Sequence, residues 1–180
     1  MRKVVVTMFM SLDGVMEAPE KWSLSYWNDE IARFKTDELF ASGAHLLGRV
    51  TYDGFAAAWP GRKDDTGFAD RMNSLPKYVV STTLKRADWS GSTIIRAGIA
   101  QEVSTLKQQP GGDILVAGSA TLVRELTRLR LVDEYRFLVY PLVLGAGKRV
   151  FADESQVGLK LAESKSFGSG VVLLRYQLDK

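Results

Sequence analysis

The sequence contains no cysteine and only one histidine, His45. Without cysteine, disulfides, thiolate nucleophiles and zinc sites built on sulfur are excluded. A single histidine cannot by itself form a histidine-rich metal site, so we predict no metal centre. His45 lies beside Leu46 and Leu47 in an apolar stretch, which favours a core or edge position over a catalytic one. No Ser-His-Asp triad can be assembled without forcing this histidine into it.

Long apolar runs and blocks of like charge are also lacking. No run reaches the length of a transmembrane helix, so no membrane contact is expected, and the amino terminus has no signal-peptide pattern. These features predict a cytoplasmic protein. The 24 Lys and Arg residues only slightly outnumber the 21 Asp and Glu residues and form no basic run. Because nucleic-acid binding depends on clustered phosphate contacts, we do not expect it here.

The composition fits one α/β domain over residues 1–180, because 46% apolar residues can supply a substantial core. Short apolar or β-branched runs predict strands over residues 4–10, 44–47, 77–81, 92–96, 113–117 and 135–140. A hairpin of residues 160–167 and 171–178 is expected to follow, around the turn at 168–170. Helices are expected between the strands, over residues 28–43, from about Thr51 to before Trp59, and over 68–73, 99–108 and 120–129.

The first predicted helix carries recognisable signals at its two ends. Asn28 is the expected N-cap, and Glu30 lies in the first turn, where carboxylates complement the helix dipole. Ile31, Phe34 and Leu39 are expected to face the core. Gly43 is the expected left-handed residue that ends the helix. The alternation of strands and helices predicts a mostly parallel central sheet with helices on both faces and a carboxyl-terminal antiparallel hairpin.

Three of the predicted strands end in motifs suited to an anion, and sheets of this kind bind ligands at the carboxyl ends of their strands. Gly48-Arg49-Val50-Thr51-Tyr52 brings backbone N–H groups, a helix dipole and a guanidinium together. Gly118-Ser119-Ala120-Thr121 has the same layout with small side chains, and Ser81-Thr82-Thr83 adds hydroxyl groups. Each motif also has an ordinary structural interpretation. The first can be a glycine turn with a solvated Arg49, the second a common Gly-Ser turn, and the third a polar loop. Gly145-Ala146-Gly147-Lys148-Arg149 matches neither a P-loop nor a Rossmann fingerprint.

Two carboxylates are candidates for a proton-transfer role. Reduction of a C=N or C=O bond requires a proton as well as a hydride, and a half-buried carboxylic acid can supply or orient that proton. Asp13 and Glu30 are the candidates. Asp13 is equally interpreted as a turn residue before Gly14, and Glu30 as a first-turn helix carboxylate.

Taken in order, these segments resemble the dihydrofolate reductase-like superfamily, in particular single-domain relatives of the reductase domain of the bifunctional riboflavin-biosynthesis deaminase-reductase. The similarity runs nearly end to end. It depends on Ser11-Leu12-Asp13-Gly14-Val15, Leu47 to Tyr52, Val80 to Thr83, Val116 to Ser119, Leu131 to Glu134 and Tyr140 to Phe151.

This resemblance implies a three-layer fold, NADPH as cofactor and a homodimer. Arg49 and Thr51 would hold the pyrophosphate beside Gly48. Ser81, Thr82 and the neighbouring Thr83 would lie at the adenosine 2′-phosphate, and Gly118, Ser119, Ala120, Thr121 and Leu122 would cradle the phosphates. The loop from Leu12 to Val15 would cover the nicotinamide, and the expected substrate contacts are Leu12, Trp27 and Phe34.

The substrate is less clearly implied, because the sequence departs from both kinds of relative. Riboflavin-type reductases share a Glu-Gly-Gly-Pro turn whose Glu meets the substrate, whereas Ala117-Gly118-Ser119-Ala120 stands here and argues against a ribosylated pyrimidine. Matching Ala32-Arg33-Phe34-Lys35 to dihydrofolate reductases places Glu30 at their acid, but no threonine partner stands at 137–139.

The leading hypothesis is an NADPH-dependent reductase of a small heterocycle, pteridine- or pyrimidine-like, or of a small carbonyl compound. The proton would come from Glu30, Asp13 or water. The alternatives are a dinucleotide-binding module without efficient catalysis and a true dihydrofolate reductase.

Overall fold

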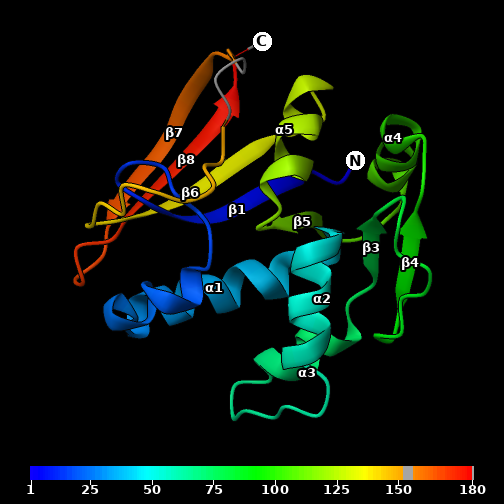
Figure 1. Ribbon diagram of the computed structural model, residues 1–180, viewed down its shortest axis with the longest axis horizontal. Coiled ribbons are helices and arrows are strands. Elements are labelled where there is room, and N and C mark those ends of the chain that lie inside the picture. The colour runs from blue at the N-terminus through cyan, green and yellow to red at the C-terminus, as the bar shows by residue number, and fades with distance from the viewer. Residues whose placement is uncertain (152–155, 180) are drawn as a thin grey trace.

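A computed structural model describes residues 1–151 and 156–179 of the chain, and these residues form one eight-stranded sheet (Figure 1). The strand order is β4-β3-β2-β5-β1-β6-β8-β7. The first six strands in this order are parallel to one another, whereas β8 runs antiparallel to both of its neighbours, β6 and β7. The bounds are β1 Val4–Ser11, β2 Ser42–Gly48, β3 Lys77–Val80, β4 Ser92–Ile95, β5 Asp113–Ala117, β6 Glu134–Tyr140, β7 Leu159–Ser166 and β8 Val172–Leu178. The predicted fold class is therefore confirmed.

Helices cover both faces of this sheet. Leu39, Tyr52 and Met72 of the first three helices pack together on one face, whereas Val103 and Leu126 of the last two join the core on the other. The helices are α1 Asp29–Ala41, α2 Arg49–Ala58, α3 Phe68–Ser74, α4 Ile99–Gln108 and α5 Ala120–Arg128, with short 3-10 turns at Pro19–Lys21 and Leu24–Tyr26. None of the helices in the described ranges is long and apolar enough to cross a membrane.

Most local predictions are confirmed. The Asn28 side chain accepts a hydrogen bond from the Ile31 N–H at 3.0 Å and caps α1. Leu122, Val123 and Leu126 of the predicted last helix are buried, and His45 is a core residue, 1% exposed.

Two helix ends differ from their predictions. Gly43 does not end α1 in a left-handed conformation, because α1 stops at Ala41 and the chain passes directly into β2. The backbone of Gly112 presses on Gly43, whose Cβ would lie 2.7 Å from the Gly112 nitrogen. Glycine is therefore needed at position 43 for close approach rather than for a turn. The second difference is that α2 begins at Arg49 and not near Thr51, since Gly48 occupies the N-cap position.

Candidate functional site

The turns that follow β2 and β5 are joined by direct hydrogen bonds. The Gly48 N–H donates to the Ser119 hydroxyl at 2.9 Å, and that hydroxyl donates to the Thr51 hydroxyl at 2.8 Å. Gly118 has φ +60°, and a Cβ there would lie 3.0 Å from the Thr51 hydroxyl oxygen. Ser119 also adopts a left-handed conformation, with φ 60°, which is costly for a non-glycine residue and is concentrated at functional sites. The structure thus brings two of the predicted motifs together.

Three helix starts at this end of the sheet have free backbone donors. No described side chain caps α2, α4 or α5, which follow β2, β4 and β5. In contrast, Asn28 caps α1, and the Asp64 carboxylate accepts from the Phe68 and Ala69 N–H groups at the start of α3. Uncapped N–H groups and the positive end of the helix dipole attract anions. The carboxyl edge of β4, β2 and β5 therefore offers several anion-binding positions.

The side chains predicted around these helix starts differ in exposure. Arg49 is exposed at the first position of α2, and Thr121 is exposed on α5. Ala120 and Leu122 are 2% and 5% exposed and belong to the core. These two residues can therefore contribute to a ligand site only through their backbone N–H groups.

The third predicted motif lines a cavity of about 350 Å³ between the ends of β3 and β4. The Ser81 hydroxyl accepts hydrogen bonds from the Thr83 and Leu84 N–H groups at 3.2 and 2.9 Å and fixes this turn. The cavity also contains Arg96 and Gly98, which the sequence reasoning missed. A usable signal was present, because Gly98 stands between a predicted strand and a predicted helix, as Gly48 and Gly118 do.

Asp13 fastens one loop to another. Its carboxylate accepts hydrogen bonds from the Ser11 hydroxyl at 2.6 Å and from the Leu144 and Gly145 N–H groups at 3.1 and 2.9 Å. These hydrogen bonds, that from Ser11 first, lower the pKa of Asp13 to about 2. The Arg149 guanidinium adds a hydrogen bond to the Asp13 carbonyl at 3.1 Å. The carboxylate is thus held ionised and shapes the loop that follows β1, which disfavours it as a proton donor.

Glu30 is exposed rather than half-buried as a proton donor was expected to be. Its carboxylate accepts a hydrogen bond from the Gly168 N–H at 2.6 Å. Gly168 lies in the turn between β7 and β8, so this contact anchors the hairpin to the start of α1.

Two of the three predicted substrate residues are open to a ligand. Leu12 and Trp27 are 69% and 44% exposed, and the Trp27 ring lies 6.3 Å from that of Phe9, near the end of β1. Phe34 instead packs against Phe167, with ring centroids 6.1 Å apart. The ring of Tyr140 lies 5.4 Å from that of Phe9 and extends this aromatic group to the end of β6.

Comparison with protein families gives a match over nearly the whole chain. Residues 2–173 match the model of the family described as the RibD C-terminal domain. An uncharacterized protein of Bacillus subtilis (strain 168), YyaP, is 33% identical, and the alignment covers 97% of this chain and 94% of that protein.

Solved structures share the fold at low sequence identity. A putative riboflavin biosynthesis protein from Shewanella sp. PV-4 superimposes with a TM-score of 0.78 at 17% identity and 99% coverage of both chains. Dihydrofolate reductase from Enterococcus faecalis, complexed with NADP(H), gives a TM-score of 0.65 at 12% identity, covering 99% of this chain and 97% of that one. The fold is therefore dihydrofolate reductase-like.

Proposed function

Because the chain belongs to the RibD C-terminal domain family, we propose that it is an NADPH-dependent reductase of a planar heterocycle or small carbonyl compound. The observation that carries this proposal is the pair of turns joined by Ser119 between two uncapped helix starts. A glycine with positive φ at position 118 lets a phosphate approach the backbone closely.

The strand ends divide into subsites for the parts of the cofactor. The first N–H groups of α2 and α5, with the exposed Arg49, would bind the pyrophosphate. Ser81, Thr82 and Arg96, which line the cavity between β3 and β4, would bind the adenosine 2′-phosphate. In the strand order the ends of β1 and β6 follow on the other side of β5. In this proposal the nicotinamide and the substrate bind at the ends of β1 and β6.

Bound NADPH supplies a hydride, and reduction of the substrate consumes one proton in addition. The chain orients the reactants, using Trp27 and the loop that Asp13 fastens beside Leu144. Asp13 is held ionised and Glu30 is exposed. In this proposal the proton therefore comes from water.

Isothermal titration with NADPH and NADH tests the cofactor assignment. We expect NADPH to bind, and Arg49→Gln to weaken binding by roughly tenfold, the size of one charge-assisted hydrogen bond. Arg128 is exposed on the last turn of α5 and already paired with Glu125, so Arg128→Gln is the matched control. Absence of NADPH binding at millimolar concentration would refute the proposal.

One observation favours a second candidate, a dinucleotide-binding module without efficient catalysis. Neither predicted acid is placed as a buried proton donor. In that case NADPH binds, but its absorbance stays constant with dihydrofolate and with a panel of heterocyclic and carbonyl substrates. Substrate-dependent loss of NADPH absorbance selects the reductase instead.

A further inference from the structure

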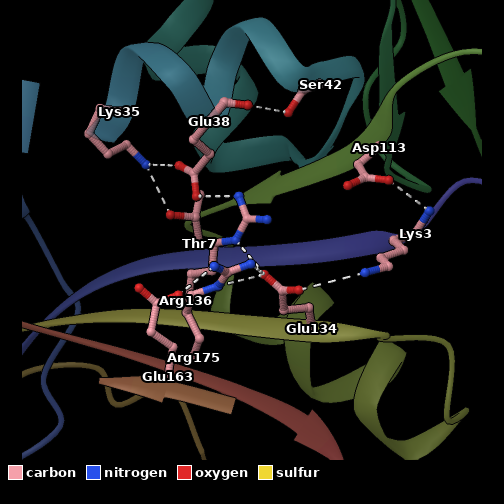
Figure 2. Close-up of polar contacts among 10 residues, drawn as sticks. All are labelled: Lys3, Thr7, Lys35, Glu38, Ser42, Asp113, Glu134, Arg136, Glu163 and Arg175. Carbon is pink, nitrogen blue, oxygen red and sulfur yellow. Dashed lines mark hydrogen bonds and ion pairs between the residues drawn. The ribbon is translucent and has the colours of Figure 1, made fainter. Parts of the chain in front are cut away.

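A network of charged side chains lies between α1 and the sheet (Figure 2). Lys35 pairs with Glu38 on α1, and Glu38 also accepts from Arg136 of β6 at 3.3 Å. Arg136 and Arg175 both contact Glu134, at 2.6 and 2.9 Å. The carboxylates of this network are buried from solvent, because the side chains of Glu38 and Glu134 are only 1% and 4% exposed.

Lys35 is the member of this network that reaches toward the candidate site. Its ammonium donates to the Thr7 hydroxyl at 2.9 Å and lies 5.4 Å from the centre of the Phe9 ring. Thr7 pairs with Ala117 in the sheet, and Ala117 directly precedes the left-handed Gly118. The ammonium therefore lies on the α1 side of the strand position that leads into the phosphate turn.

The contacts of this ammonium leave it able to bind a ligand. An ammonium has three N–H donors, and the described residues accept from it at Thr7 and Glu38. Glu38 neutralises Lys35 only in part, because the same carboxylate also accepts from Arg136. The side chain of Lys35 is 14% exposed, compared with 1% for Glu38. The lysine is thus the more accessible side chain of this ion pair.

We propose that Lys35 is a substrate-binding residue and that the substrate presents a hydrogen-bond acceptor, a ring carbonyl or a carboxylate, to its ammonium. This inference rests on the proposed function, because it assumes that the site beside the phosphate turn takes the substrate. Thr7 and Glu38 are positioning residues that hold the ammonium between the sheet and α1. Phe9 and Trp27 supply the apolar surface for a planar ring.

This arrangement selects ligands by their polar group. An ammonium has no acceptor, so it binds carbonyl and carboxylate oxygens and repels amidinium or ammonium groups. Benzoate and benzamidine are suitable probes because both consist of one benzene ring and have closely similar shapes, but benzoate carries a negatively charged carboxylate and benzamidine a positively charged amidinium. We expect benzoate to bind more tightly than benzamidine.

The experiment is a titration of both probes into the full chain, followed by Trp fluorescence and by chemical-shift changes. Lys35→Met should weaken benzoate binding by roughly tenfold or more, the effect of losing one charged hydrogen bond, and should remove the preference over benzamidine. Thr7→Val keeps the charge and the side-chain shape and should weaken benzoate binding to a smaller extent. Lys160→Met, at an exposed position on β7, is the matched control and should bind both probes as the wild type does.

Circular dichroism and thermal unfolding establish that each variant is folded before it is titrated. Failure of benzoate to bind, equal binding of the two probes, or wild-type benzoate affinity in Lys35→Met overturns the inference. The titrations are run with and without NADPH. Failure of NADPH to bind counts against the proposed function, whereas the probe preference without NADPH still tests Lys35.

Discussion

The protein should lose stability between pH 7 and pH 5, and replacement of His45 should abolish most of that loss. Burial and, to a smaller extent, the nearby cations Lys77, Lys35 and Arg71 together lower the pKa of His45 to about 3. In the unfolded chain the pKa returns to the ordinary histidine value of 6.5. As the pH falls below that value, the unfolded state takes up the proton before the folded state does, so stability is lost progressively toward pH 3. At one and a half units below the unfolded pKa the loss is about 2 kcal/mol.

The assay is urea unfolding of the wild type and of His45→Leu at both pH values, followed by circular dichroism. His45 is the only histidine, and the carboxylates with lowered pKa, such as Asp13 and Asp64, lose their contribution mainly below their unfolded value of 3.8. The variant should therefore show only a small fall in its free energy of unfolding. An equal fall of about 2 kcal/mol in both proteins, or no fall in the wild type, would show that His45 is not the group responsible.

Three further variants test the candidate site. Gly118→Ala should lower the free energy of unfolding by about 1 kcal/mol or more and weaken NADPH binding, because the left-handed φ and the 3.0 Å approach to Thr51 disfavour a Cβ. Urea unfolding and titration calorimetry measure the two effects. The control is Gly54→Ala, which should not destabilise the protein, because a Cβ there meets nothing within 4 Å. Arg96→Gln should weaken NADPH binding by roughly tenfold and leave NADH binding nearly unchanged in calorimetry; equal losses for both cofactors would remove Arg96 from the 2′-phosphate subsite. Asp13→Asn should speed amide hydrogen exchange at Leu144 and Gly145, whose N–H groups the carboxylate accepts, and unchanged exchange there would contradict its loop-fastening role.

Local patterns in the sequence predicted much of the fold. The bounds of β5 and α4 agree with the predicted residues 113–117 and 99–108, because each segment combines a regular apolar period with clear breakers at its ends. Gly43 shows where such reasoning fails. Its role is set by contact with the Gly112 backbone, and no local signal distinguishes that contact from a helix cap.

The candidate site was predictable as separate motifs but not as one assembly. Glycines at strand ends identified the phosphate turns, whereas the hydrogen bond from Ser119 to Thr51 joins residues 68 positions apart. The contact between Asp13 and Gly145 spans 132 positions. Both depend on strand order, which the sequence reasoning did not fix. The ion pair of Glu38 with Arg136 was missed for the same reason.

The most direct test of the central claim is a crystal structure of the protein with NADPH bound. We expect the pyrophosphate to lie between the turns at Gly48 and Gly118 and the 2′-phosphate to lie beside Ser81 and Arg96. This expectation would be contradicted by NADPH bound elsewhere, for instance in the cavity of about 390 Å³ that Tyr52 and Trp89 line between α2 and the segment after β3.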